Sequence, residues 1–441
     1  MNLAYKYPVA YWNCAVLSCN SGAMEEEGSD KKTSTQYGKI AKAIGELQKQ
    51  KIKVNNPDIN KSKFRFSVDK ENHNIFYGLK GISKINDEDI QHIIQNRPYS
   101  NLEDFYNKTY KFLNKSKVIS LIKGGCFDSI EGPDRIKTMK KFIEMVSTVD
   151  FKTKLTLANL RPLLENNLVP QEYKLETRIY KFKQHLLNNA RLDNNKSWVV
   201  LEPKFALPFF EEHYSPHVKL DRDIKFSNNG EVIVSENALD RVTKKLLTPL
   251  TDWLKTEDAL TYANELVLLD NWNNHVKHNN VQKWEMESIS FYSDKHELDF
   301  VNLDAYGVCN YYDLPTEPTY EYYNGKKTMD IFTIAGTVVD KNRTKHTVSL
   351  LTPTGIATVK FNKGAFNHYN KQISSFNKQL NKSVVVDTSW FERGSLVMVK
   401  GYRQDDRFMA RNYSGHTVSR IIGTRDKDLL WLQTDRHGSN N

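Results

Sequence analysis

A tight turn at residues 82–86 carries residue types that could bind a phosphate group. It reads Ile-Ser-Lys-Ile-Asn, with Lys84 at its tip and Asn86 at its end. Backbone N–H groups at such a turn, together with the N-terminus of the next helix, bind phosphate without reading bases. Asparagine tolerates a left-handed backbone and lysine does not, so Asn86 is expected to adopt that conformation. A turn with only a structural role is an equally open interpretation.

A second turn combines Lys123 with the glycine pair Gly124 and Gly125, and Arg135 follows at the start of the next expected helix. Glycine turns expose backbone N–H groups well, so we expect this turn to contact DNA. Two helix-hairpin-helix units in tandem would hold duplex DNA through its backbone. Because only the second turn contains a glycine pair, changing Lys123 to glutamate is expected to weaken duplex binding more than changing Lys84.

After Met329 the sequence alternates apolar and polar residues in five short runs bounded by turns. This pattern predicts five strands, with a helical interval over residues 366–380 before the fourth. Such an arrangement suits a small closed barrel of the OB type, which binds single strands by aromatic stacking and a basic groove. Candidate binding residues are Arg343, Lys345, Lys360, Phe361, Tyr402 and Arg407. The alternative for Phe361 is that barrel aromatics simply fill the core.

Other chemistry is poorly supported. Asp221 and Asp223 lack a third acidic partner and are interpreted as a surface turn rather than a metal site. The histidines are dispersed, and no phosphate-loop pattern is present. The cysteines show neither zinc-ligand nor disulfide spacing, which indicates a reduced compartment; they are Cys14, Cys19, Cys126 and Cys309. No catalytic residue and no metal ligand is therefore expected in this chain.

The bulk composition favours a polyanionic partner. The 441 residues have a net charge of +10 and a pI near 9.0, which points toward nucleic acid. No apolar run reaches the ~20 residues that a transmembrane helix needs, so an intracellular, cytoplasmic location and no membrane contact are expected. Length suggests two to four domains.

The segments on either side of the two turns are expected to be helical. Apolar residues recur at helical spacing over residues 36–47, 102–106, 117–122 and 134–146. Residues 150–280 give a mixed pattern. Residues 308–327 are rich in tyrosine and proline, which indicates a linker with exposed aromatic groups.

From Gln36 to Ile143 the sequence resembles the bacterial DNA polymerase III alpha subunit, the C-family replicase. The matching stretches include "IFYGLKGISKINDEDIQHIIQNR", "YSNLEDF" and "NKSKVISLIKGGCFDSI", in the order of that family. Further on, "WEMESISFYSDKHEL" is similar to the "KE-x-LGFYLS-x-HP" stretch that precedes the family's OB domain. The first turn departs from the family's "IKGVG", because both glycines are replaced.

The resemblance implies an α+β multidomain protein: a helical fingers remnant and tandem helix-hairpin-helix, a mixed linker region, and a small OB-type β-barrel. The implied boundaries are 1–60 for the end of the fingers and 61–149 for the hairpins. An insert and linker (150–327), the OB-fold (328–422) and a tail (423–441) follow. Within residues 1–60, apolar anchors such as Tyr5, Tyr7, Tyr11 and Trp12 would meet either a partner or the chain's own helix at 37–50.

The resemblance also implies a role in DNA replication. The family's palm carboxylates, which hold two Mg²⁺, are absent from these 441 residues. We therefore expect a palm-bearing polymerase polypeptide as partner, with Mg²⁺ bound there and not by this chain. Such a division would arise from a gene split, as in a bacteriophage, or from truncation. The sliding clamp is a further possible partner. The alternative is a non-catalytic DNA-binding accessory protein derived from a polymerase.

Overall fold

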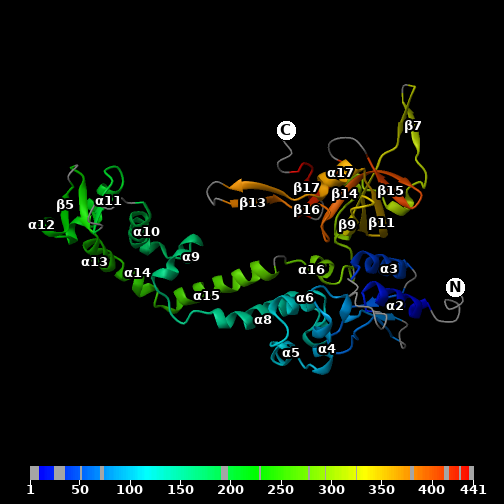
Figure 1. Ribbon diagram of the computed structural model, residues 1–441, viewed down its shortest axis with the longest axis horizontal. Coiled ribbons are helices and arrows are strands. Elements are labelled where there is room, and N and C mark those ends of the chain that lie inside the picture. The colour runs from blue at the N-terminus through cyan, green and yellow to red at the C-terminus, as the bar shows by residue number, and fades with distance from the viewer. Residues whose placement is uncertain are drawn as a thin grey trace. The chain divides into compact units, whose positions relative to one another are not determined.

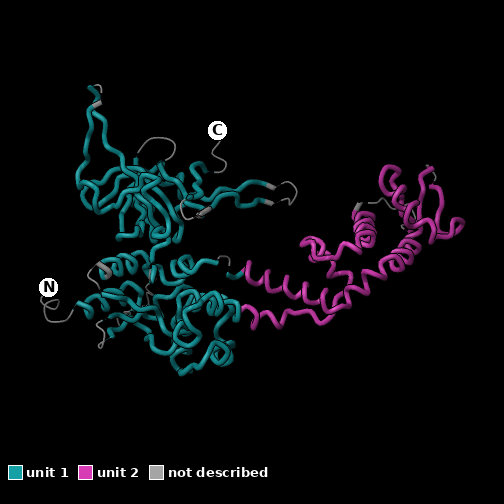
Figure 2. Tube along the Cα trace, turned by 180° about the vertical axis from the view of Figure 1, so that it is seen from behind, with its two compact units in different colours: residues 1–142, 275–441 teal, residues 143–274 magenta. Residues whose placement is uncertain are grey.

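The chain forms two compact units in a computed structural model (Figure 2). Unit 1 comprises residues 1–142 and 275–441, and unit 2 comprises residues 143–274. The structure describes residues 9–23, 35–49, 52–69, 74–189, 197–227, 230–276, 279–293, 295–323, 325–377, 382–411, 417–426 and 429–436.

Unit 1 begins with two helices, α2 (Val9–Asn20) and α3 (Tyr37–Lys49). A three-stranded sheet of order β1-β3-β2 follows, formed by β1 (Val54–Asn55), β2 (Ser67–Asp69) and β3 (Asn74–Phe76). Of the predicted N-terminal anchors, Tyr11 and Trp12 are 40% and 51% exposed. Tyr5 and Tyr7 lie outside the described residues.

A helical region follows the small sheet. It consists of the 3₁₀ turn η1 (Leu79–Gly81) and helices α4 (Asp87–Gln95), α5 (Leu102–Thr109), α6 (Lys115–Lys123), α7 (Asp128–Glu131) and α8 (Arg135–Ser147). The first predicted turn is therefore preceded by a single 3₁₀ turn rather than by a full helix. Gly81 is needed there because a Cβ would lie 2.7 Å from the ring of Tyr77.

Residues 143–274 form unit 2, although the sequence predicted only an insert and linker there. Its helices are α9 (Leu160–Glu165), α10 (Lys174–Asn189), α11 (Ala206–His213), α12 (Leu220–Asp223), α13 (Glu236–Leu246), α14 (Thr248–Trp253) and α15 (Glu257–Asn271). An antiparallel sheet of order β4-β6-β5 is formed by β4 (Trp198–Val200), β5 (Ile224–Phe226) and β6 (Val232–Ser235). Apolar residues of these elements, among them Leu163, Phe210 and Trp253, make a core of its own.

Helix α16 (Val281–Ser288) returns the chain to unit 1 and packs against α6. Trp284 and Met286 on this helix are fully buried. The chain then makes 3₁₀ turns at Glu297–Phe300, Asp304–Tyr306 and Tyr311–Asp313. A two-stranded hairpin of β7 (Tyr320–Tyr323) and β8 (Lys326–Met329) follows.

The predicted OB-type barrel is confirmed (Figure 1). Its strands are β9 (Phe332–Asn342), β10 (Thr347–Thr352), β11 (Gly355–Lys360), β14 (Leu396–Gln404) and β15 (Arg407–Ala410). They close in the order β9-β10-β11-β15-β14, with β14 pairing back to β9. All these pairs are antiparallel except β11 with β15. Alternating residues such as Val359 and Phe408 point inward and are fully buried.

The barrel carries additions that the sequence did not predict. The expected helix over residues 366–380 is instead α17 (Lys363–Asn370), followed by a hairpin of β12 (Ile373–Asn377) and β13 (Lys382–Asp387). The β-branched residues 384–386 favour a strand there. Strands β16 (Val418–Asp426) and β17 (Leu429–Gln433) extend the sheet beyond β14.

Candidate nucleic-acid interface

The first turn presents Lys84 to solvent. Lys84, not Asn86, has the left-handed backbone, with φ of 67° against −97° for Asn86. This corrects the sequence-based expectation. The Lys84 side chain is exposed, and its Nζ donates to Ser116 Oγ at 3.1 Å. A non-glycine residue in this region is strained, and such strain is often found at functional sites.

Asn86 has a different role from the one predicted, because it caps helix α4. Its side chain accepts a hydrogen bond from Asp89 N (2.8 Å), and the Asp89 carboxylate accepts one from Asn86 N (2.9 Å). This reciprocal capping box requires an extended backbone at Asn86. Asp89 also pairs with Lys117 at 2.7 Å. The N-terminus of α4 is thus already occupied by the chain's own carboxylate, and Lys84 is an exposed cation of this turn.

The second turn is a helix C-terminus whose backbone donors are used internally. The N–H groups of Gly124, Gly125 and Cys126 donate to carbonyl oxygens of α6 at 3.0, 3.0 and 3.1 Å. Gly125 has φ of 82°, the conformation that ends helices and favours glycine. These glycines therefore serve the fold, and the structure contradicts the expectation that their N–H groups are displayed for phosphate.

Lys123 and Arg135 are buried instead of exposed. Lys123 is 6% exposed, and its Nζ donates to Val276 O (3.0 Å) and pairs with Glu287 (2.5 Å). Arg135 is 5% exposed and lies between Asp128 (2.8 Å) and Glu285 (2.7 Å). Both cations bind helix α16 or its flanks, so the structure contradicts the expectation that their charged ends face DNA.

Arg393, which sequence reasoning missed, joins the first turn to the barrel. It lies just before β14, and its guanidinium donates to Ser290 Oγ (2.9 Å), Ser83 Oγ (3.0 Å) and Glu287 O (2.8 Å). Ser83 N also donates to Ser288 O at 2.8 Å. The segment 285–290 therefore connects the helical region with the barrel. The resemblance of this segment to "KE-x-LGFYLS-x-HP" was visible in the sequence. That resemblance did not indicate which residues the segment would contact.

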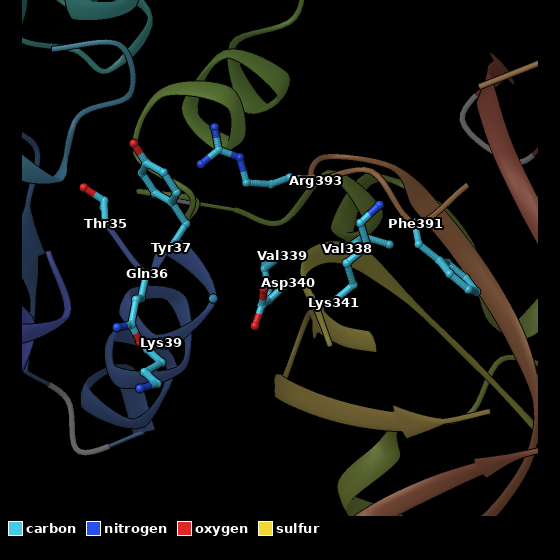
Figure 3. Close-up of a pocket in the computed structure, with 11 residues that line it drawn as sticks. Thr35, Gln36, Tyr37, Lys39, Val338, Val339, Asp340, Lys341, Phe391 and Arg393 are labelled. Atoms are coloured by element: carbon cyan, nitrogen blue, oxygen red, sulfur yellow. The ribbon is translucent and has the colours of Figure 1, made fainter. Parts of the chain in front are cut away.

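Arg393 also lies over the ring of Tyr37, with its Cζ 4.0 Å from the ring centroid. Figure 3 shows both side chains beside a cavity of about 420 Å³ between α3 and the barrel. Gly38 and Asp340 line the same cavity, and a Cβ on Gly38 would lie 2.1 Å from Asp340 Cβ. Helix α3 therefore packs closely against the barrel at strands β9, β10 and β11.

Three of the residues predicted to bind single-stranded nucleic acid lie together on the barrel's outer face. Lys360 and Tyr402 both pair with Met409, and Arg407 pairs with Thr358. Because directly opposite residues point to the same face, these side chains form one surface across β11, β15 and β14. Arg407 is 57% exposed and 3.8 Å from Asp406. A basic face with an aromatic ring suits single-stranded nucleic acid.

Two further predicted cations lie at the edge of this surface. Arg343 and Lys345 are exposed in the turn between β9 and β10, and Lys360 Nζ donates to the carbonyl oxygen of Lys345. Phe361 does not join them. It is 2% exposed, with its ring 5.0 Å from that of Phe391 inside the barrel. Its predicted role in stacking is therefore contradicted, and the core alternative holds.

Positive charge is concentrated in unit 1. Unit 2 contains 17 Lys and Arg against 19 Asp and Glu, whereas unit 1 contains 46 against 34. The net charges are therefore −2 and +12. The attraction for a polyanion predicted from the whole chain thus belongs to the unit that holds the first turn and the barrel.

The described residues contain no group of three or more His, Cys, Asp or Glu that could hold a metal ion. Asp223 of the acidic pair is buried and bonded to Arg241 at 2.6 Å. No helix among the described residues is long and apolar enough to cross a membrane.

The comparisons with known proteins agree with this geometry. Residues 51–137 match the family model of a helix-hairpin-helix motif. The chain is 39% identical to the probable DNA polymerase YorL of Bacillus subtilis (strain 168) over 99% of its own length and 34% of that protein. The same values hold for the DNA-directed DNA polymerase of Bacillus phage SPbeta. It is 30% identical to the DNA polymerase III subunit alpha of Pseudomonas aeruginosa over 29% of this chain and 11% of that protein. The chain thus spans about a third of the length of YorL and of the phage SPbeta polymerase.

Proposed function

We propose that this chain, which is similar to the phage SPbeta DNA polymerase and to the DNA polymerase III subunit alpha of Pseudomonas aeruginosa, binds primer–template DNA during replication. Unit 1 holds the duplex through the Lys84 turn and the single-stranded template on the outer face of the barrel. The observation that carries this proposal is the gathering of Lys360, Tyr402 and Arg407 on one open face. Arg393 connects the barrel that bears this face to the Lys84 turn.

Nucleotide transfer needs carboxylates that hold two Mg²⁺ ions. In our proposal these belong to a palm outside the 441 residues, and the palm-bearing polypeptide contacts α2, where Tyr11 and Trp12 are exposed. The sliding clamp is a further proposed partner. A non-catalytic accessory role would use the same DNA contacts. Primer extension by the chain together with a palm-bearing polypeptide separates the two, because an accessory protein would not restore synthesis.

Changing Lys84 to glutamate is expected to weaken binding of the full chain to blunt duplex DNA equally for all sequences. A lysine that contacts phosphate releases about one counterion, so the slope of log affinity against log salt should fall in magnitude by about 1. Fluorescence anisotropy with a labelled duplex at several salt concentrations measures both quantities. Lys255→Glu, an exposed change in unit 2, is the matched control and should leave the slope unchanged.

Lys123→Glu is the comparison variant. The sequence predicted that it would weaken duplex binding more than Lys84→Glu does, and the structure predicts the opposite. The Lys123 ammonium is buried, so this change should lower the melting temperature rather than remove a phosphate contact. If folded Lys84→Glu keeps the wild-type slope, the first turn does not bind phosphate. If the wild-type chain binds neither duplex nor single strand, the proposed function is wrong.

Replacing Ser290 with glycine is expected to reduce the preference of the chain for a primer–template junction. The change removes the hydroxyl that accepts from Arg393. Glycine also adopts the φ of 64° found at Ser290 without strain. Stability should therefore change little, while the alignment of the first turn and the barrel loosens. The measurement is the ratio of affinities for a junction, a blunt duplex and a single strand.

In this experiment only the junction affinity should fall, by several-fold, and Arg393→Ala should produce a larger loss. Arg161→Ala is the control, because this exposed arginine of unit 2 forms a surface ion pair with the exposed Glu165. An equal loss for all three substrates would mean that the contact stabilises the fold without aligning the two surfaces.

A further inference from the structure

The hairpin of β7 and β8 displays aromatic rings that the barrel does not use. Figure 1 shows it projecting from the barrel beside β15. Tyr322 is 74% exposed and Tyr320 is 43% exposed. Residues 320–329 include three tyrosines and two lysines but no leucine, isoleucine, valine or phenylalanine. The tyrosine-rich stretch expected to be a linker is therefore an ordered element with a distinct surface.

The pairing of the two strands sets which side chains share a face. Tyr320 pairs with Met329, and Tyr322 pairs with Lys327. Directly opposite residues lie on one face, so Tyr320, Tyr322 and Lys327 face the same way. Lys327 Nζ lies 4.0 Å from the centroid of the Tyr320 ring. Residues two apart on a strand are separated by ~7 Å, about twice the ~3.5 Å contact distance between carbon atoms, which leaves room for a base to stack.

The base of the hairpin is fixed to the barrel at the rim of the candidate interface. Arg403 on β14 donates to the carbonyl oxygens of Tyr311, Tyr312 and Leu314 at 3.3–3.4 Å. Asp405 N, in the turn between β14 and β15, donates to Thr316 O at 2.7 Å. The same turn is flanked by Tyr402 and Arg407. The hairpin therefore rises from the edge of the basic face.

We propose that the hairpin β7–β8 is a second binding site for single-stranded nucleic acid, where unpaired bases stack on Tyr322 and Tyr320. Lys327, on the same face as the two rings, supplies positive charge for the phosphates, and Lys326, its neighbour on β8, adds charge on the opposite face. The site continues the barrel surface, so this inference rests on the proposed function and extends it beyond the barrel.

The chemistry of the hairpin favours nucleic acid over a protein partner. Lysine is depleted in protein–protein interfaces, whose centres are more apolar than this surface. Tyrosine rings accept bases of any sequence by stacking, and lysines follow the backbone. The hairpin also belongs to unit 1, which carries the net charge of +12.

The test uses the full chain with Tyr322→Ala, Tyr322→Phe and Tyr322→Leu, and two probes. One is a blunt duplex, and the other is the same duplex with a long oligothymidylate tail. Loss of one stacked base should weaken binding of the tailed probe by at least about fivefold for Tyr322→Ala. Tyr322→Phe should retain wild-type affinity, whereas Tyr322→Leu should not, because leucine keeps apolar area without a flat ring. Phe226→Ala, an exposed aromatic on an edge strand of unit 2, is the control.

A tail containing 5-iododeoxyuridine gives a second readout that does not depend on affinity. Photocrosslinking to residues 320–329 in the wild-type chain supports the proposal. Equal binding of the tailed probe by wild type and Tyr322→Ala, without crosslinking to the hairpin, overturns it. If the leucine variant is as good as wild type, the surface is an apolar protein contact and the proposal is also wrong. If no variant binds the blunt duplex, in contrast, the duplex-binding part of the proposed function is wrong.

Discussion

Replacing Arg135 with methionine is expected to lower the free energy of unfolding by about 3–5 kcal/mol, the usual loss when one partner of a buried ion pair is removed. Arg135 is 5% exposed and lies between Asp128 (2.8 Å) and Glu285 (2.7 Å). Methionine fills much of the space but leaves Glu285, itself 4% exposed, as a buried charge without its cation. Equilibrium unfolding in urea, followed by circular dichroism, measures the change.

Lys141→Met is the control for this experiment. Lys141 pairs with Glu131 at 2.8 Å but is 46% exposed, so its loss should cost no more than about 1 kcal/mol. Adding Glu285→Gln to Arg135→Met should restore part of the stability, because the uncompensated charge is removed. A midpoint for Arg135→Met equal to that of the control would show that the buried ion pairs do not hold the helical region against α16.

Acidification from pH 6.5 to pH 4 is expected to destabilise unit 1 through His296. Burial lowers the pKa of His296 from 6.5 to about 4, although the Leu351 carbonyl and Asp299 act in the opposite sense. In the neutral ring Nε2–H donates to Leu351 O (2.8 Å) and Nδ1 accepts from Leu298 N (3.0 Å), so an added proton at Nδ1 would face a donor. The unfolded chain binds a proton more readily than the folded chain over this range. The stability supplied by the neutral ring is thus present above pH 6.5 and is lost as pH falls toward 4.

The difference between the two pKa values corresponds to about 3 kcal/mol. Glu297 also titrates nearby. Burial raises its pKa, so its protonation stabilises the folded chain as pH falls, opposite to the effect of His296. The effect of the histidine is therefore read from the difference between wild type and His296→Asn. Asparagine can still cap the turn at Leu298 N. Parallel stability curves for the two proteins between pH 7 and pH 4 would contradict the assignment to His296.

The barrel was readable from the sequence because its signals are local. Alternation of apolar and polar residues specifies which side of a strand faces the core, as at Val359 and Phe408. Lys360, the residue after Val359, accordingly lies on the outer face. The alternation could not place Phe361, which directly follows β11 and turns into the core beside Phe391. The hairpin β12–β13 was missed because the preceding helical pattern was extended too far.

The positions of the two turns were also set by local sequence, whereas their roles were not. Asn86 was assigned the left-handed backbone from its intrinsic tolerance, but its side chain is needed to cap α4, which requires an extended backbone. The strained conformation therefore falls to Lys84. Here two local requirements competed, and the hydrogen bonds with Asp89 decided between them.

The sequence alone was sufficient to predict the helices around the two turns, the five barrel strands and the excess of positive charge, because periodicity, turn residues and net charge are properties of the chain itself. Which cations are exposed to a partner depends instead on contacts between segments that are distant in the sequence. Lys123 and Arg135 meet Glu287 and Glu285 across more than 140 residues of sequence, including the whole of unit 2. A cation buried against a carboxylate and a cation exposed to solvent have the same residue type, and the contact that distinguishes them forms when α16 packs against α6.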